Sequence, residues 1–416
     1  MKSTKSRRTV LVQLNSLGLR GTELIAVDFA HAILPFGYDS VLIGPRDSLP
    51  TGPSLFDVAS DRGVKLEAYD RPTTVMQGAR RLNERARAIG ADIVHIYGPW
   101  AARSAYWGPS LLGRRPLVLT DYEMALSPDT FTAPQLIIGT TYLLEEQADR
   151  YGPTTLISPP VDLSKDNPRA AGGEAFRSEF GLDQAHIMVV LIGRVDTTMK
   201  ARGIEVAIEA MHNLGRDDTT LFVVGTGDAE ARLRELAETV NAEFGRRAVI
   251  FTGARSDPRP AYLAADISIG MGGSASRALA FGNPLIVQGE NGWNRIFTPH
   301  SSAGLFRNSF WSDERSDDPA RELAGLLNEL ADDSDLRASL GQFGESFAQS
   351  HFGLPQMTER LADCYAMASR SYRARSWFHD IRFEALAAAY RVSGRKPAAT
   401  SDNQPSAYSF SLGGRR

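Results

Sequence analysis

Two rounds of alternating strand-like and helix-like segments run along this chain, and this alternation limits the fold more than any other feature. In the first round, short apolar runs such as residues 9–15 (TVLVQLN) and 40–45 (SVLIGP) are strand-like. Between them, residues 22–34 carry apolar side chains at helical spacing behind Thr22, a helix-capping residue type. Strands that alternate with helices indicate βαβ units, which build a parallel sheet with helices on both faces.

A polar, proline-containing stretch at residues 153–168 interrupts the alternation, which restarts at residues 186–193 (HIMVVLIG) and turns all-helical from about Asp318. We therefore predict an α/β fold with two Rossmann-like, doubly wound parallel-sheet domains and a C-terminal helical segment. The predicted parts are an N-terminal domain over 1–158, a second domain over 159–370, a helix over 371–392 and a disordered polar tail over 393–416.

Composition excludes several classes of protein. The 416 residues are enough for two domains with real cores. The 46 basic and 49 acidic side chains nearly cancel, which argues against nucleic acid as a partner. The single cysteine, Cys364, excludes an intramolecular disulfide and fits a reducing compartment. No apolar run approaches the roughly 20 residues of a membrane span, and the basic start does not resemble a signal peptide. The sequence predicts a cytoplasmic protein.

Four loops each leave a predicted strand and enter a predicted helix. A helix N-terminus carries unpaired N–H groups and a partial positive charge, so this position suits an anion. The loops cover residues 15–23, 193–203, 225–230 and 270–277. Their glycines permit close backbone approach, although such turns also arise for packing reasons. In the second loop, Arg194 and Lys200 either converge on one anionic group or are two solvated surface cations.

Several longer segments together resemble a known family. They are residues 191–210 (LIGRVDTTMKARGIEVAIEA), 221–237 (LFVVGTGDAEARLRELA), 249–271 and 277–293 (RALAFGNPLIVQGENGW). In order and spacing they look like the C-terminal half of the GT-B glycosyltransferases, and more narrowly of the retaining family 4, or group 1. Residues 92–100 (DIVHIYGPW) and 156–163 (LISPPVDL) occupy the places of a strand and a hinge in that family. The resemblance covers roughly residues 9–370.

The resemblance implies a metal-independent glycosyltransferase that retains the configuration of the sugar it moves. Its first domain would bind the acceptor, its second would bind a nucleotide-diphosphate sugar, and the last helix would pack back on the first domain. No cofactor is implied beyond the nucleotide-sugar co-substrate. The donor sugar, the base and the acceptor are not specified by the sequence.

The resemblance also assigns residues. Arg194 and Lys200 would hold the donor diphosphate and stabilise the leaving group as positive charge develops on the anomeric carbon. Glycine backbone and one serine would surround the nucleotide sugar. These further donor-site candidates are Gly18, Gly21, Gly193, Gly225, Gly227, Gly273 and Ser274.

Arg277 departs from the family pattern, because it stands where a ribose-binding glutamate is expected and the loop before it has no acid. A carboxylate accepts two hydrogen bonds from a diol, whereas a guanidinium only donates. Four alternatives follow. Arg277 grips a phosphate or carboxylate of the donor, the nucleotide is held differently, the site no longer binds one, or Arg277 pairs with a nearby acid and serves structure.

The first domain offers weaker candidates for contact with the acceptor or the transferred sugar. His95 lies on a predicted buried strand, where we favour a core role, and Tyr97 stands where family members often carry a second histidine. The Tyr97 hydroxyl could still reach substrate. Asp121 and Glu123 follow another predicted strand and complete this group.

Two other functions stay open from the sequence. One is a binding or auxiliary protein that kept the fold and lost turnover, and the other is a nucleotide-sugar epimerase using Asp121, Glu123 and Glu290. We predict no metal site, because the acidic residues 331–335 lie in a solvated turn without converging ligands. The basic, aromatic stretch 371–391 fits either bracing of the first domain, which we favour, or peripheral contact with an anionic membrane.

Overall fold

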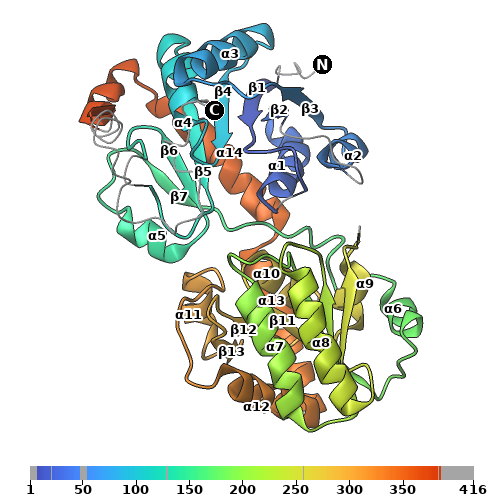
Figure 1. Cartoon of the computed structure of the whole chain (residues 1–416). Helices are drawn as coiled ribbons and strands as arrows, with labels where there is room; N and C mark the ends of the chain where they lie inside the picture. The colour runs from blue at the N-terminus through green and yellow to red at the C-terminus, as the bar shows by residue number, and fades with distance from the viewer. Residues whose placement is uncertain are drawn as a thin grey trace, which may run out of the picture. The chain divides into compact units, whose positions relative to one another are not determined.

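The computed structural model describes residues 7–19, 21–46, 54–127, 130–255, 257–382 and 384–385. The chain folds as two compact units: unit 1 combines Met1–Pro160 with Leu354–Arg416, and unit 2 is Val161–Gly353. Each unit contains one sheet covered by helices (Figure 1). The prediction of two Rossmann-like α/β units is therefore confirmed.

Unit 1 contains a seven-stranded parallel sheet in the order β3-β2-β1-β4-β5-β6-β7. Its strands are β1 (Arg8–Gln13), β2 (Tyr38–Pro45), β3 (Lys65–Tyr69), β4 (Ile93–Tyr97), β5 (Leu117–Asp121), β6 (Gln135–Ile138) and β7 (Thr154–Leu156). Val10 of β1 pairs with Ser40 of β2 on one side and with Ile93 of β4 on the other. The order of strands reverses between β1 and β4, so the ligand-binding position expected for this sheet lies at the carboxyl ends of these two strands.

Helices cover both faces of this sheet, because successive residues of a strand point to opposite faces. Val10 and Val12 pack in a core with α1 (Gly21–Ala32) and α14 (Leu354–Ser371). Leu11 packs in the other core, beside α3 (Val75–Ala88) and α4 (Ala102–Ala105). The remaining elements before α14 are η1 (Leu34–Phe36), α2 (Leu55–Asp61), the π-helical η2 (Tyr106–Leu112) and α5 (Thr141–Glu146).

Helix α14 belongs to unit 1, although the predicted second domain extends to residue 370. Leu361, Cys364 and Tyr365 of α14 are buried in the core of unit 1. The ring of Tyr365 meets Tyr38 edge-on at 5.1 Å. Unit 2 therefore ends at Gly353, because the apolar face of α14 packs on the first sheet. Helical periodicity shows that a helix has an apolar face but does not show which sheet receives it.

Unit 2 contains a six-stranded sheet in the order β10-β9-β8-β11-β12-β13, in which β13 alone is antiparallel to its neighbour. Its strands are β8 (Ile187–Ile192), β9 (Thr219–Val224), β10 (Val249–Gly253), β11 (Ile267–Gly270), β12 (Leu285–Gln288) and β13 (Asn294–Ile296). The strand order reverses between β8 and β11, so the crevice of this sheet opens at their carboxyl ends.

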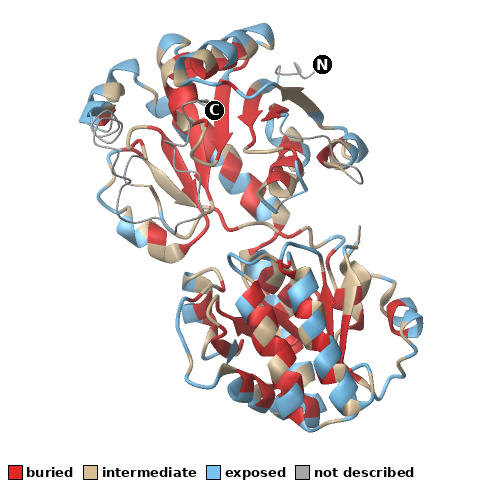
Figure 2. Cartoon of the chain, in the orientation of Figure 1, coloured by how far each residue is buried: buried red, intermediate tan, exposed pale blue. Residues whose placement is uncertain are grey.

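The helices of unit 2 begin and end at residues suited to those positions. α7 ends before Gly215 and α8 before Gly245, which have left-handed φ values of 68° and 61°. α12 begins after Asp318, whose side chain accepts a 3.2 Å hydrogen bond from the Arg321 N–H. The helices are α6 (Gly173–Glu179), α7 (Ala201–Leu214), α8 (Glu230–Phe244), α9 (Arg259–Ala264), α10 (Gly273–Ala280), α11 (Ser302–Arg307), α12 (Pro319–Asp332) and α13 (Ser334–His351). The strands are largely buried between them (Figure 2).

After α14 the chain forms η3 (Ala374–Ser376) and then a helical stretch over 377–382 and 384–385. These residues lie in unit 1, as does the Tyr372 hydroxyl, which donates to the Ser110 carbonyl at 2.6 Å. The rest of the predicted helix 371–392 and the predicted tail 393–416 lie outside the described residues. None of the helices that the structure describes is both long and apolar enough to cross a membrane.

Candidate functional site

A small cavity opens in unit 2 where the strand order reverses. Its walls are the carboxyl ends of β8 and β11, the loop after β11, the start of α7 and the end of β12. The lining residues include Leu191, Ile192, Lys200, Gly203, Ile269, Gly270, Met271, Ser274 and Gln288. Open α/β sheets bind ligands at such a reversal. The structure thus brings together two of the predicted donor-site residues, Lys200 and Ser274, and adds Gln288, a polar residue at the end of a buried strand.

Lys200 is a half-buried residue that lines this cavity. Burial lowers the pKa of the Lys200 ammonium, as does nearby Arg194, while Asp196 opposes the shift. Gly193 faces Lys200 so closely that a Cβ there would lie 2.5 Å from the lysine Nζ. Within the described ranges, no hydrogen bond or ion pair joins this ammonium to an acceptor. The charge of Asp196 offsets only part of the cost of burying the ammonium, because the pKa of Lys200 is still lowered. An anion placed in the cavity would therefore be stabilised.

The first turn of α10 lies at the same cavity. Gly272 has a φ of 57°, and its carbonyl accepts from the N–H groups of Ala275 at 3.0 Å and Ser276 at 3.2 Å. The N–H groups of Gly273 and Ser274 have no acceptor among the residues that the structure describes. A Cβ at Gly273 would meet nothing within 4 Å, so the turn is open. Unpaired N–H groups and the helix dipole favour an anion here.

Arg194 lies on the loop that leads from β8 to Lys200, outside the cavity lining. Its side chain is 68% exposed, and its guanidinium lies 3.6 Å from the carboxylate of Asp196. Asp196 also accepts a 2.9 Å hydrogen bond from the Met199 N–H, which fixes the turn before α7. The two predicted cations therefore share one loop, with Lys200 inward and Arg194 towards solvent.

The three predicted glycines after β8 and β9 have a packing role. A Cβ at Gly225 would lie 1.8 Å from the Gly193 carbonyl oxygen, and a Cβ at Gly227 would lie 2.2 Å from that of Val195. The Gly193 N–H donates to Val224, and the Gly225 N–H donates to Gly253, both at 3.0 Å. These N–H groups are engaged within the protein, so the glycines hold the two loops together.

Arg277 forms an ion pair with an acid that the sequence analysis did not single out. Its Nε lies 2.8 Å from the carboxylate of Asp166, which is buried. Burial raises the pKa of Asp166, while Arg277 and Arg259 counteract that shift. Of the four alternatives for Arg277, the structure shows the ion pair with a nearby acid. Sequence spacing gave no signal, because Asp166 lies far away in the chain, in the segment before α6.

At the reversal point of unit 1, the loops after β1 and β4 touch. A Cβ at Gly98 would lie 1.9 Å from the side chain of Asn15. The Ser16 hydroxyl donates to Glu23 at 2.9 Å and accepts from the Gly18 N–H at 3.3 Å. Glu23 is buried in the first turn of α1, where its carboxylate suits the helix dipole. The predicted Gly18 is thus engaged within the turn, and Gly21 begins the helix.

His95 and Tyr97 are core residues of unit 1. The two ring nitrogens of His95 form hydrogen bonds with Tyr365 at 2.8 Å and Thr120 at 2.7 Å. Burial lowers the pKa of His95 to about 3, so the ring is neutral. Tyr97 is buried against His95, with ring centroids 4.5 Å apart. The favoured core role of His95 agrees with these contacts, and neither side chain is open to a substrate.

Asp121 is a buried acid at the carboxyl edge of the sheet of unit 1. It ends β5 and lines a cavity with Gly98, Pro99, Arg103 and Thr120. Its carboxylate accepts a 3.0 Å hydrogen bond from the Glu123 N–H, yet burial raises the pKa of Asp121 to about 7. A perturbed acid in a cavity at the ligand-binding edge of an α/β sheet is a candidate functional group.

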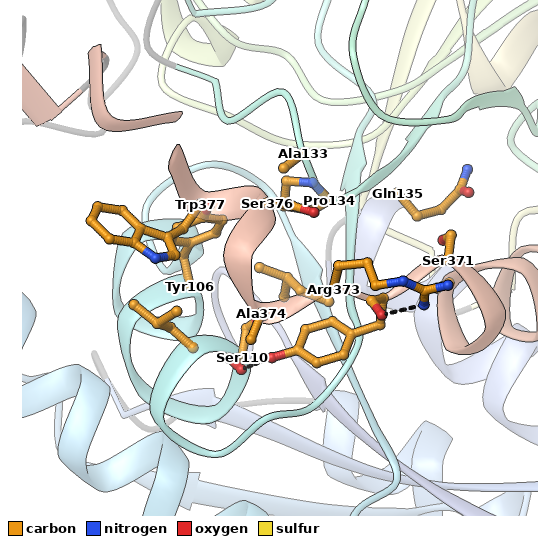
Figure 3. Close-up of a pocket in the computed structure, with 14 residues that line it drawn as sticks. Tyr106, Ser110, Ala133, Pro134, Gln135, Ser371, Arg373, Ala374, Ser376 and Trp377 are labelled. Atoms are coloured by element: carbon orange, nitrogen blue, oxygen red, sulfur yellow. Dashed lines mark hydrogen bonds between the residues drawn. The ribbon is translucent and has the colours of Figure 1, made fainter. Parts of the chain in front are cut away.

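Other groups are less suited to chemistry. The carboxylate of Glu290 accepts a 3.2 Å hydrogen bond from the Trp311 indole. The described ranges contain no cluster of three or more His, Cys, Asp or Glu residues that could hold a metal ion. A further pocket of unit 1 is lined by Gln135, Arg373, Trp377 and other residues (Figure 3). It lies at the amino ends of β5 and β6, away from the edge where α/β sheets bind ligands.

Comparison with known families identifies the segment that forms the unit 2 cavity. Residues 186–329 match the family model described as Glycosyl transferases group 1. A search of the curated proteins found no match. The predicted resemblance to this family is confirmed, and it covers the loops around Lys200 and Arg277.

Solved glycosyltransferase structures share the fold of the chain. A glycosyltransferase from Rickettsia africae ESF-5 has a TM-score of 0.69 at 15% identity, over 88% of this chain and 99% of that chain. HepE from Anabaena, in complex with UDP and glucose, has a TM-score of 0.66 at 17% identity, over 86% and 100%. The catalytic domain of Starch Synthase IV from Arabidopsis thaliana, bound to ADP and acarbose, has a TM-score of 0.62 at 13% identity, over 88% and 100%. The fold is GT-B.

Proposed function

We propose that this chain is a cytoplasmic glycosyltransferase that moves a sugar from a nucleotide-diphosphate donor to an acceptor. The observation that carries the proposal is the unit 2 cavity, where the Lys200 ammonium and the open first turn of α10 are both without an acceptor in the described part of the chain. A cation and the partly positive N-terminus of a helix at one cavity favour an anionic ligand with several acceptor oxygens. A diphosphate is such a ligand, and the HepE and starch synthase structures were solved with UDP and ADP.

The proposed chemistry uses charge that the protein has already placed. As the bond between the anomeric carbon and the diphosphate breaks, negative charge grows on the departing phosphate oxygen. Lys200 and the N–H groups of Gly273 and Ser274 would stabilise that charge, and Arg194 would supply a second side-chain cation. Removing one preorganised group of this kind lowers turnover by about 10²–10³. We further propose that these groups act without a metal ion and that the reaction retains the anomeric configuration.

The acceptor is assigned to unit 1. We propose that Asp121 and Glu123 contact the acceptor or the transferred sugar, because Asp121 lines a cavity at the carboxyl edge of the sheet. An acid whose pKa is raised to about 7 can exchange a proton near neutral pH. In this proposal Arg277 does not contact the substrate. Its ion pair with Asp166 holds the first turns of α10 in place.

The test is thermal unfolding with UDP, GDP, ADP, TDP and CDP and their sugar adducts, with and without EDTA. A ligand at 100 times its Kd adds about 2.7 kcal/mol of stability. We expect one nucleotide to stabilise the protein equally with and without EDTA. The Lys200→Met variant should lose this shift, and a Lys165→Met variant should keep it, because Lys165 is an exposed lysine of unit 2 that pairs with Asp162.

If both variants kept the nucleotide-induced shift, Lys200 would not be part of the binding site. If no nucleotide stabilised the wild-type protein, the proposal of a donor site would be wrong. The binding or auxiliary function would then be the better explanation of a loop without an acid and of an arginine committed to Asp166.

A further inference from the structure

The helical stretch over 377–382 and 384–385 exposes apolar side chains and turns acidic ones towards the protein. A surface helix of a globular protein normally buries its apolar side chains and exposes its charged ones. Here the acids Asp380 and Glu384 face the protein, while Phe378 and Ile381 are 62% and 51% exposed. Most of the described residues between 373 and 385 are exposed (Figure 2).

The inward face is held by polar contacts. Asp380 is buried and accepts hydrogen bonds from the Tyr106 hydroxyl at 2.9 Å, the Thr132 N–H at 2.7 Å and the Ala133 N–H at 3.1 Å. Glu384 pairs with Arg103 and accepts from the Trp107 indole at 3.2 Å. Asp380 and Glu384 are four residues apart and therefore share one helix face. These contacts fix the orientation of the stretch.

The outward face follows from this orientation. Phe378, Ile381 and Arg382 stand at positions i, i+3 and i+4, which is one stripe of a helix. Phe378 also stacks on Trp377, with ring centroids 4.3 Å apart, and Trp377 lines the pocket of Figure 3. Folding of unit 1 therefore does not bury the largest apolar side chains of this stripe.

Exposed arginines lie close in sequence to the apolar stripe. Arg373, Arg375 and Arg382 are exposed, and the two acids of the stretch face inward. The sequence after it, residues 386–416, adds five basic side chains (Arg391, Arg395, Lys396, Arg415 and Arg416) against one acid, Asp402. Exposed apolar side chains with exposed arginines nearby in the chain, on a helix fixed against its own domain, complement a surface that is apolar below and anionic above.

We propose that the stripe of Phe378 and Ile381, together with the exposed Arg373, Arg375 and Arg382, is a docking surface for an anionic phospholipid bilayer. The two apolar side chains would enter the boundary between headgroups and acyl chains, while the guanidinium groups contact lipid phosphates. One face of the helical stretch would then brace unit 1, and the opposite face would contact the membrane. This inference does not depend on the proposed glycosyl transfer.

A second copy of the chain fits this stripe less well. The exposed parts of the two apolar side chains amount to on the order of 200 Å², whereas a stable protein interface buries about 800 Å² per partner. Two copies that met through this stripe would also bring their arginines together, and like charges at an interface are unfavourable.

The test is co-sedimentation of the full chain with vesicles of phosphatidylglycerol and phosphatidylcholine in equal parts, compared with vesicles of phosphatidylcholine alone. We expect binding to the anionic vesicles only, and weaker binding as salt is raised. The double variant Phe378→Ser/Ile381→Ser should bind about tenfold or more weakly. Arg375→Glu should also weaken binding. The control is Phe36→Ser, another exposed phenylalanine of unit 1, which should bind as the wild type does.

The double variant removes exposed side chains, so its thermal unfolding should match that of the wild type. Absence of wild-type binding to anionic vesicles at low salt would overturn the proposal. So would equal binding by the double variant and the wild type, or an equal loss in Phe36→Ser. If sedimentation velocity instead showed a dimer that only the double variant loses, the stripe would be a contact between copies and not a lipid surface.

Discussion

Replacing Asp121 with asparagine should stabilise unit 1 at pH 8 and change it little at pH 4. The carboxylate ends β5 in a cavity, and its Oδ1 accepts from the Glu123 N–H at 3.0 Å. An asparagine amide oxygen can accept the same hydrogen bond. The substitution therefore removes the buried negative charge while it keeps the shape and the contact of the side chain.

The magnitude follows from the pKa of the carboxyl group, which burial raises from 3.8 to about 7. A carboxyl group whose pKa is higher in the folded state than in the unfolded state prefers to be protonated in the folded protein. Relative to the ionised form, the protonated form therefore stabilises the fold at low pH. This stabilisation is lost as the pH rises through the folded-state pKa. With 1.36 kcal/mol per pKa unit, ionisation costs unit 1 about 4 kcal/mol at pH 8 and roughly 0.6 kcal/mol at pH 4. The neutral amide of the variant has no such cost, so the advantage of the variant should grow between these two pH values.

Hydrogen exchange followed by mass spectrometry on peptides from β5 measures this free energy in unit 1 alone, even if the two units unfold separately. Asp218→Asn, observed on β9, is a control of opposite sign. The Arg216 hydrogen bond lowers the pKa of Asp218 to about 2, so its ionised form favours folding and its removal should destabilise unit 2 near neutral pH. A pH-independent difference for Asp121→Asn, or a variant less stable than the wild type at pH 8, would refute the reasoning.

Three further substitutions test the other buried charges. Lys200→Met should raise the stability of unit 2 at pH 7 in urea unfolding, because burial lowers the pKa of the ammonium and the charged form is the costly one below that pKa; equal stability would mean that Lys200 is fully solvated. Arg277→Ala should cost about 2 kcal/mol at pH 7 and progressively less as the pH is lowered and Asp166, whose pKa is raised by burial, becomes protonated; a loss that does not change with pH would contradict the ion pair. Asp380→Ala should cost about 3 kcal/mol, because it removes a buried carboxylate that accepts from the part-buried donors of Thr132 and Ala133 and from the Tyr106 hydroxyl, and limited proteolysis near residue 371 should accelerate.

Much of the fold follows from local patterns. The β-branched runs at β1 and β8 and the helical spacing of α7 depend on neighbours in sequence, and these elements lie where the sequence indicates them. The assignment of α14 to unit 1 depends instead on packing between distant segments, such as the contact of Tyr365 with Tyr38. A single sequence carries no record of such contacts.

The candidate site shows the same limit. Lys200 and Ser274 could be named from the sequence because each stands at a fixed offset from the end of a strand, and parallel strands align their carboxyl ends. The glycines at 225 and 227 look like phosphate-binding residues but pack one loop on another. The partner of Arg277 could not be named, because an ion pair with Asp166 depends on how the segment before α6 folds back.

The buried charges of this protein fall into two kinds, and the difference supports the assignment of the site. Asp380 and Asp166 are surrounded by donors or by an arginine, which is how buried ions that serve structure are usually held. Burial also disfavours the charged forms of Lys200 and Asp121, which have far fewer partners in the described ranges, and both residues stand at the carboxyl edge of a sheet. Stability alone would favour a neutral side chain at both positions, so their charge is better explained by what binds beside them. On this reasoning, Lys200→Met and Asp121→Asn should each give a more stable protein with a weaker activity.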